Sequence, residues 1–175
     1  NWQKLLDLDV IFFGNSRSKF NPNTNLFELE CSNGPKECLG NSILTCAKYN
    51  LDQNFYLNYI VCMEKNTKNA NFSESNKFCL SDFPKKLMAV ENCLNSFNGN
   101  KLFNMEVNLS PKNRYVPWIE INGVQNEKKQ IALTKNFKSF LCNMDYNKKF
   151  NYEFCEKILP PEIEIEYKEI VIEEY

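Results

Sequence analysis

Eight cysteines limit what this 175-residue chain can fold into. Their number is even and they are dispersed along the chain, at Cys31, Cys38, Cys46, Cys62, Cys79, Cys93, Cys142 and Cys155. This pattern predicts structural disulfides and an oxidising environment, either the secretory pathway, a lysosome-like compartment or the outside of the cell. Buried free thiols in a cytosolic protein are the alternative. Eight cysteines allow roughly a hundred pairings, and the sequence does not choose among them.

The remaining composition excludes several classes of protein. The sequence has no histidine, which rules out Ser-His-Asp triads, Cys-His proteases and zinc sites with histidine ligands. It contains neither a C-x-x-C pair nor a short cysteine knuckle, so the usual motifs of a cysteine-only zinc site are absent. A formal net charge of −1 gives no indication of nucleic-acid binding. No apolar run reaches the roughly 18 residues that a membrane span needs.

In the first half of the chain, apolar spacing predicts one strand followed by short helices. Residues 6–14 (LDLDVIFFG) indicate a buried strand, and the polar residues 15–26 indicate a loop. Helical spacing follows at 41–49, 55–66 and 84–97, the last beginning at Pro84 and ending at Gly99.

In the second half, residues 115–123 (YVPWIEING) favour a strand that closes in a tight Asn122-Gly123 hairpin turn. Residues 128–142 favour a helix with one apolar stripe. After Pro160 and Pro161, the stretch EIEIEYKEIVIEEY alternates charged and apolar residues, which is typical of a strand at a sheet edge. We interpret it as an acidic tail or last edge strand, with pairing to a partner protein as the second interpretation.

Two glycosylation sequons occur, at Asn71 (N-F-S) and Asn108 (N-L-S), and Pro111 should reduce use of the second. The chain contains 27 asparagines, so sequons also arise by chance. Such an excess suggests an AT-rich genome, as in some protozoan parasites.

The segment CSNGPKECLGNSILTC, residues 31–46, resembles the signature of the gamma-interferon-inducible lysosomal thiol reductase (GILT) family, C-Q-H-G-x₂-E-C-x₂-N-x₄-C. Ser32 and Asn33 replace the Gln and His of the signature. Residues 60–64 and 115–123 are also similar to family segments, and the likeness covers roughly residues 6–155. The matching signature positions are Cys31, Gly34, Glu37, Cys38, Asn41 and Cys46.

This resemblance implies an α/β, thioredoxin-like fold with a disulfide-rich helical insertion. The expected parts are residues 1–26 (first part of the core), 27–109 (insertion), 110–159 (second part of the core) and 160–175 (acidic tail). Residues 6–14 resemble the second strand of the family fold, so the first strand, the first helix and the catalytic C-x-x-C are expected upstream of this chain.

The resemblance also implies roles for the signature residues. All eight cysteines correspond to the family's non-catalytic set, and the three in residues 31–46 are expected to tie the insertion to the core. A redox role for Cys31 and Cys38 is the alternative. Gly34 is expected in a tight turn and Asn41 at the cap of the helix that carries Cys46.

The activity implied by the resemblance is reduction of disulfides in protein substrates, which needs no metal or organic cofactor. The Val116-Pro117 bond would be cis and would face the dithiol, so that Val116, Pro117 and Trp118 bind the substrate peptide; an ordinary trans proline is the alternative. Residues 1–175 alone are expected to show no turnover. A non-catalytic binding or assembly subunit, whose acidic tail docks onto a partner protein, is the alternative function, and a lumenal adhesion or inhibitor domain is the third.

Overall fold

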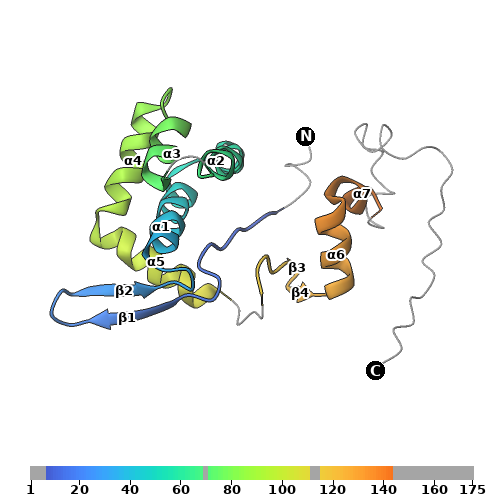
Figure 1. Cartoon of the computed structure of the whole chain (residues 1–175), viewed down its shortest axis with the longest axis horizontal. Helices are drawn as coiled ribbons and strands as arrows, with labels where there is room; N and C mark the ends of the chain where they lie inside the picture. The colour runs from blue at the N-terminus through green and yellow to red at the C-terminus, as the bar shows by residue number, and fades with distance from the viewer. Residues whose placement is uncertain (1–6, 69–70, 111–114, 144–175) are drawn as a thin grey trace. The chain divides into compact units, whose positions relative to one another are not determined.

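A computed structural model describes residues 7–68, 71–110 and 115–143 (Figure 1). The chain forms two compact units, Trp2–Val116 and Pro117–Tyr175. In the described residues both units are rich in helix, and each contains one two-stranded antiparallel sheet. Neither sheet has the central parallel strands of a thioredoxin-like core, so that fold and its missing first strand stay predictions. None of the described helices is long and apolar enough to cross a membrane.

The first unit begins with an irregular segment where a strand was expected. Residues 7–13 pair with no strand in the described part of the chain, although Phe13 is completely buried. Side chains bind their carbonyl groups instead: Lys48 Nζ lies 3.1 Å from Val10 O, and Gln53 Nε2 lies 3.3 Å from Leu8 O. The prediction of a strand at 6–14 is therefore wrong, since an apolar run forms a strand only beside a second strand.

The expected loop at 15–26 is wrong as well, because it contains half of a hairpin. Strand β1 (Arg17–Asn21) pairs with β2 (Leu26–Glu30). The connection includes Asn25 in the left-handed conformation, with φ of 57°, which asparagine tolerates better than most residues. Charged residues occupy alternate positions on both strands. The stretch therefore has few apolar residues, and the sequence did not indicate a hairpin.

Five helices follow in the first unit: α1 (Pro35–Asn50), α2 (Gln53–Asn66), α3 (Phe72–Cys79), α4 (Pro84–Leu94) and α5 (Phe97–Leu109). The predicted helices at 41–49 and 55–66 lie in α1 and α2. The helix predicted at 84–97 corresponds to α4 but ends earlier, at Leu94, and Gly99 does not end a helix. It lies in the first turn of α5, because Ser96 caps that helix by accepting a hydrogen bond from Gly99 N. Asp52 and Asn71 cap α2 and α3 in the same way.

The core of the first unit surrounds α1, which contacts β2 and each of the other four helices. Apolar residues along α1, with Phe13 and Phe103 packed ring against ring, are fully buried. The buried apolar residues of this core are Phe13, Cys31, Ile43, Leu44, Cys46, Ala47, Leu51, Tyr56, Leu57, Tyr59, Met63, Leu80, Val90 and Phe103.

One asparagine fastens the hairpin to α5. Asn100 Oδ1 accepts a hydrogen bond from Phe27 N at 2.7 Å, and Asn100 Nδ2 donates one to Phe27 O at 2.8 Å. The side-chain amide therefore pairs with β2 as a neighbouring strand would. Asn104, one turn later, accepts a bond from Ser18 Oγ at 2.6 Å.

The second unit confirms the predicted Asn-Gly hairpin. Strands β3 (Glu120–Ile121) and β4 (Val124–Gln125) flank Asn122 and Gly123, whose φ angles are 54° and 74°, as a tight hairpin turn requires. The helix predicted at 128–142 is divided into α6 (Glu127–Lys135) and α7 (Phe137–Cys142). Asn136 separates them, because its extended backbone ends α6 and its side chain caps α7.

Asn100→Asp should lower the free energy of unfolding by about 1–3 kcal/mol, because a carboxylate keeps the acceptor for Phe27 N but leaves Phe27 O without a donor. Chemical denaturation would measure the loss. Asn98→Asp is the matched control on the same helix, and it should leave stability nearly unchanged because Asn98 is exposed. Equal stabilities of the two variants would contradict the assigned role of Asn100.

Candidate functional site

The signature segment forms the junction between β2 and α1. Cys31 follows β2 directly and is disulfide-bonded to Cys38 in the first turn of α1. Between them Gly34 has a φ of 86°, which side chains rarely adopt, and its N–H donates to Cys31 O at 3.0 Å. The Glu37 carboxylate accepts a hydrogen bond from Asn33 N. The expected tight turn at Gly34 is confirmed.

The expected cap at Asn41 is wrong. The helix that carries Cys46 begins at Pro35, so Asn41 lies inside α1. Proline at the first helical position needs no amide hydrogen, and the turn at Gly34 delivers the chain to it. A proline start was predicted for α4 but not considered for α1.

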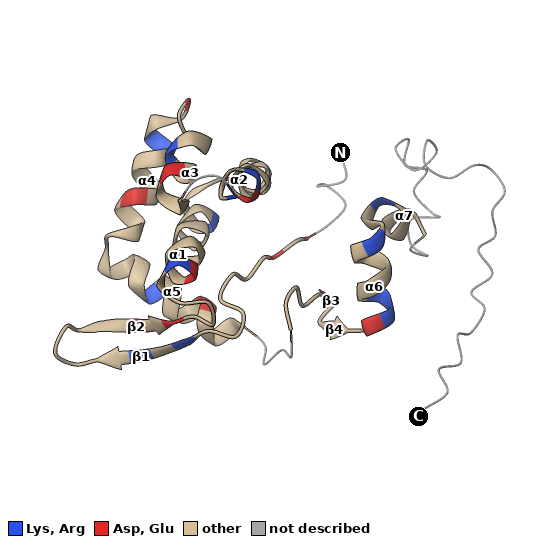
Figure 2. Cartoon of the chain, in the orientation of Figure 1, with Lys and Arg blue, Asp and Glu red and all other residues tan. Residues whose placement is uncertain are grey.

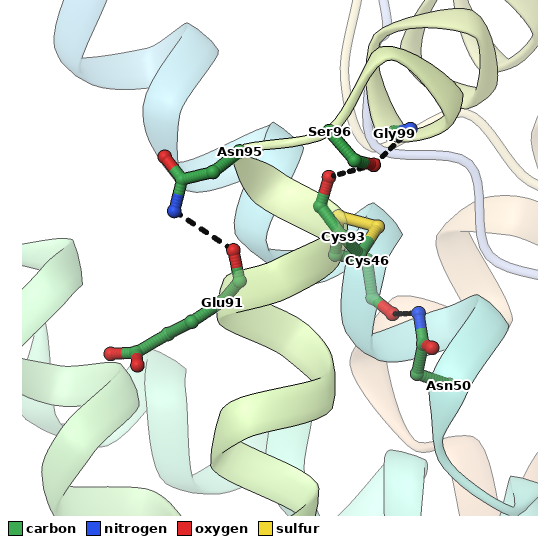
Figure 3. Close-up of a disulfide and its surroundings, with 7 residues drawn as sticks. All are labelled: Cys46, Asn50, Glu91, Cys93, Asn95, Ser96 and Gly99. Carbon is green, nitrogen blue, oxygen red and sulfur yellow. Dashed lines mark hydrogen bonds between the residues drawn. A yellow bond between two sulfur atoms is a disulfide. The ribbon is translucent and has the colours of Figure 1, made fainter.

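The Cys46–Cys93 disulfide joins α1 to α4 where α4 ends (Figure 3). Cys46 is completely buried, whereas Cys93 is half-buried. The Ser96 hydroxyl donates to Cys93 O at 2.9 Å and accepts from Gly99 N at 2.9 Å. A Cβ atom on Gly99 would lie 1.9 Å from Cys93 O, so this position requires glycine.

An open pocket of about 500 Å³ adjoins the half-buried end of this bridge. Its lining is rich in amide side chains and contains no carboxylate. The lining residues are Tyr49, Asn50, Ala89, Asn92, Cys93, Ser96, Asn98, Gly99 and Leu102. Tyr49 is the one titratable side chain among them, and its burial and its bond to Glu106 raise its pKa. The pocket thus offers hydrogen bonds but no group that exchanges protons near neutral pH.

The other cysteines in the described residues are also oxidised. Cys62 on α2 is bonded to Cys79 on α3, and Cys142 at the end of α7 is disulfide-bonded too. No cysteine in the described part of the chain is free; Cys155 lies outside it. The bridges among residues 31–93 all join elements within the predicted insertion. The expectation that the three cysteines of residues 31–46 tie the insertion to the core is therefore wrong, because each of them already has its partner inside the insertion. Their non-catalytic role stays a prediction.

The most deeply buried charged group is Glu106 on α5, whose side chain is fully buried. Its Oε1 accepts hydrogen bonds from Lys48 Nζ at 3.0 Å and from Tyr49 OH at 2.8 Å. Lys48 also reaches Asp9, at 2.6 Å. Burial lowers the pKa of Lys48, but its bonds to Asp9 and Glu106 outweigh that effect and raise the pKa above its ordinary value.

The geometry of this cluster of Asp9, Lys48, Tyr49 and Glu106 indicates a structural role. The cluster binds the segment 7–13, α1 and α5 together, and it lies beside no described thiol. In the described residues no group of three or more Cys, Asp or Glu side chains could hold a metal ion.

The predicted substrate-binding loop is accessible. Val116 is 64% exposed, Pro117 is exposed and Trp118 is half-buried, with its Nε1 donating to Glu120 Oε1 at 3.0 Å. Gln130 on α6 holds the loop, since its Nε2 donates to Pro117 O at 3.0 Å and its Oε1 accepts from Ile119 N at 3.0 Å. The cis state of the Val116-Pro117 bond and its binding role stay predictions.

Both glycosylation sequons lie on helices at exposed asparagines. Asn71 caps α3 through its Oδ1, which accepts from Glu74 N at 2.9 Å. Asn108 lies inside α5, and its Nδ2 donates to Asn104 O at 2.8 Å. Exposure is compatible with a glycan at either site, and glycosylation stays a prediction.

Sequence reasoning missed three polar residues that organise these regions: Glu106 and Gln130, which are buried, and Asn100, which is half-buried. Each binds a partner far along the chain, with sequence separations of 58, 73 and 13 residues. A polar residue within an apolar helical stripe is the available signal for Glu106, which lies between Phe103 and Val107.

The fold and the site define a helix-rich, disulfide-bonded domain whose described cysteines are all oxidised. Comparison with known proteins agrees with the signature segment. The family model described as "Gamma interferon inducible lysosomal thiol reductase (GILT)" matches residues 1–83, and this match supports membership of the family.

Three relatives show the extent of the similarity. A gamma-interferon-inducible lysosomal thiol reductase of Carassius auratus is 30% identical over 146 residues, covering 80% of this chain and 56% of the relative. A GILT-like protein of Caenorhabditis elegans is 28% identical, covering 75% and 41%. A gamma-interferon-responsive lysosomal thiol protein of Arabidopsis thaliana is 26% identical, covering 79% and 56%. The chain thus spans about half the length of the relatives it matches.

Replacing each bridge by a pair of alanines should destabilise the fold in order of loop length. The sequence separations are 7 for Cys31–Cys38, 17 for Cys62–Cys79 and 47 for Cys46–Cys93. Loop-closure entropy then predicts losses of about 2, about 3 and about 4 kcal/mol in the free energy of unfolding. Denaturant titrations of the three double variants would measure them, and a reversed order would contradict a purely structural role.

Glu106→Gln should cost about 1–3 kcal/mol, because it removes the buried negative charge that Lys48 and Tyr49 bind. Lys48 keeps Asp9, but that carboxylate is 66% exposed and its attraction is screened by water. Denaturation of this variant and of the exposed control Glu64→Gln would show the difference. If the two variants are equally stable, the cluster does not hold the unit together.

Proposed function

We propose that the chain is the disulfide-bonded part of a thiol-disulfide oxidoreductase that reduces disulfides in protein substrates. The observation that carries this proposal is the match to the GILT family, with the signature segment folded into the bridged junction Cys31–Cys38 at the start of α1. The name of the Carassius auratus relative, a lysosomal thiol reductase, supports both the chemistry and a secretory or lysosome-like location.

In the proposed mechanism, the reducing dithiol is a C-x-x-C pair in a segment preceding residue 1. The first thiolate attacks a substrate disulfide, one substrate sulfur leaves as a thiolate, and a mixed disulfide forms. The second thiol then attacks this mixed disulfide, so that the substrate ends with two thiols and the enzyme with one disulfide. In this proposal the described cysteines remain structural disulfides and supply no electrons.

The loop Val116–Trp118 would hold the extended substrate during the exchange. Its exposure and its support by Gln130 favour this role. In a protein with turnover, Pro117→Ala should raise KM for a protein disulfide while leaving the reduction of a small disulfide nearly unchanged. An equal effect on both substrates would contradict a peptide-binding role.

A second candidate is a binding or assembly subunit without a dithiol. The observation that favours it is that residues 1–175 contain no C-x-x-C pair. Its partner would bind the acidic residues 160–175, which lie outside the described residues.

Insulin reduction separates the two candidates. Residues 1–175 should show no turnover above background, whereas the product of the whole coding sequence should, and replacing both cysteines of its C-x-x-C pair by serine should abolish it. Turnover by residues 1–175 alone would contradict the mechanism. A whole product without turnover, together with a partner lost on deletion of residues 160–175, would establish the second candidate instead.

A further inference from the structure

The outer edge of β1 carries backbone groups that point away from its partner strand. The register places Phe20 opposite Phe27 and Ser18 opposite Leu29. Both backbone groups of Phe27 bind the Asn100 side chain, so they point away from β1. Opposed residues of antiparallel strands exchange either both hydrogen bonds or neither, in alternation. Phe20 and Ser18 therefore belong to the pairs that exchange none, and their N–H and C=O groups point outward.

The two edges of this hairpin differ in what covers them. Asn100 occupies the β2 edge at Phe27, and Figure 1 shows β1 as the strand farther from the helices. In the described part of the chain, no backbone hydrogen bond outside the hairpin involves β1. An open strand edge of this kind is a template for another strand.

The side chains of β1 specify what such a strand must contain. Arg17 and Lys19, blue in Figure 2, lie on one face of the hairpin and are exposed. Ser18 and Phe20 lie on the other face, where the apolar ring of Phe20 remains 45% exposed. A matching strand therefore alternates acidic residues, opposite Arg17 and Lys19, with apolar residues that cover Phe20.

The chain itself contains such a strand. Residues 162–167 read EIEIEY, with a glutamate at every second position and apolar residues between them. These residues lie outside the described part of the structure, so the strand is inferred from sequence and the edge from geometry.

We propose that residues 162–167 of a second copy of this chain add to the outer edge of β1 as a third strand. Glu162, Glu164 and Glu166 then lie on the face of Arg17 and Lys19, and Ile163 and Ile165 lie on the face of Phe20. Every copy carries both the edge and the strand, so two copies exchange them reciprocally and form a closed dimer with two-fold symmetry. This interface goes beyond the proposed reductase activity and does not depend on it.

Amide exchange measured by NMR tests the pairing directly. At concentrations where sedimentation shows a dimer, the amides of Ser18 and Phe20 should be protected, and dilution to monomer should expose them. The Lys19 amide bonds to β2 and is the internal control, because it should stay protected in both states.

The double variant I163P/I165P removes the amide hydrogens of the added strand and should give a monomer with exposed Ser18 and Phe20. Its matched control, I170P/I172P, should remain a dimer.

Charge reversal tests whether the glutamates of the added strand lie on the same face as Arg17 and Lys19. Lys19→Glu should weaken the dimer about tenfold, and the additional substitution Glu164→Lys should restore it. Lys36→Glu, the same change at an exposed site on α1, should have no effect, and protection of the residue 19 amide in each variant shows that the hairpin has folded.

Three results would overturn the proposal. They are a monomer at all concentrations with freely exchanging Ser18 and Phe20 amides, protection of these amides that is independent of concentration, and a dimer that survives I163P/I165P.

Discussion

The disulfide between Cys46 and Cys93 fixes the helix on which the first unit is assembled. Cys46 is fully buried in the C-terminal half of α1, and the bridge holds α1 against the end of α4. Because α1 contacts β2 and the other four helices of the unit, restraining it limits the positions open to all of them. Gly99 and Ser96 then turn the chain sharply into α5 beside this bridge. This covalent link at the centre of the unit stabilises a chain that is rich in asparagine and in exposed charged residues.

Side chains replace strands throughout this structure. Lys48 and Gln53 bind carbonyl groups of the segment 7–13, Asn100 binds both backbone groups of Phe27, and Gln130 brackets Pro117 to Ile119. Asparagine and glutamine carry a donor and an acceptor side by side, as a peptide unit does. Backbone groups can therefore be satisfied without a wide sheet. In the described residues this explains why short hairpins and an irregular segment lie stably against helices.

How far the sequence predicted this arrangement depends on the range of each interaction. Predictions that depend only on neighbouring residues were confirmed. They are the Asn122-Gly123 turn, the tight turn at Gly34 and the central parts of α1, α2 and α4. The strand at 6–14 and the loop at 15–26 were wrong, because pairing depends on what lies opposite in space. The partners of Glu106, Asn100 and Gln130 could not be predicted from the sequence, since they lie well away along the chain. The family signature in residues 31–46 needed only local spacing.

The composition of this domain has a consequence for compartments of different acidity. Histidine is the side chain whose ordinary pKa lies between about 5 and 8, and the sequence has none. In the described residues no thiol is free to ionise, and the pKa values that shift do so away from that range: upward for Lys48 and Tyr56, downward for Asp52. The described fold therefore offers neither a histidine nor a free thiol that could change its charge between a neutral lumen and a mildly acidified vesicle. A pH-dependent switch between the two compartments would therefore have to use groups other than histidine or a free thiol of this scaffold.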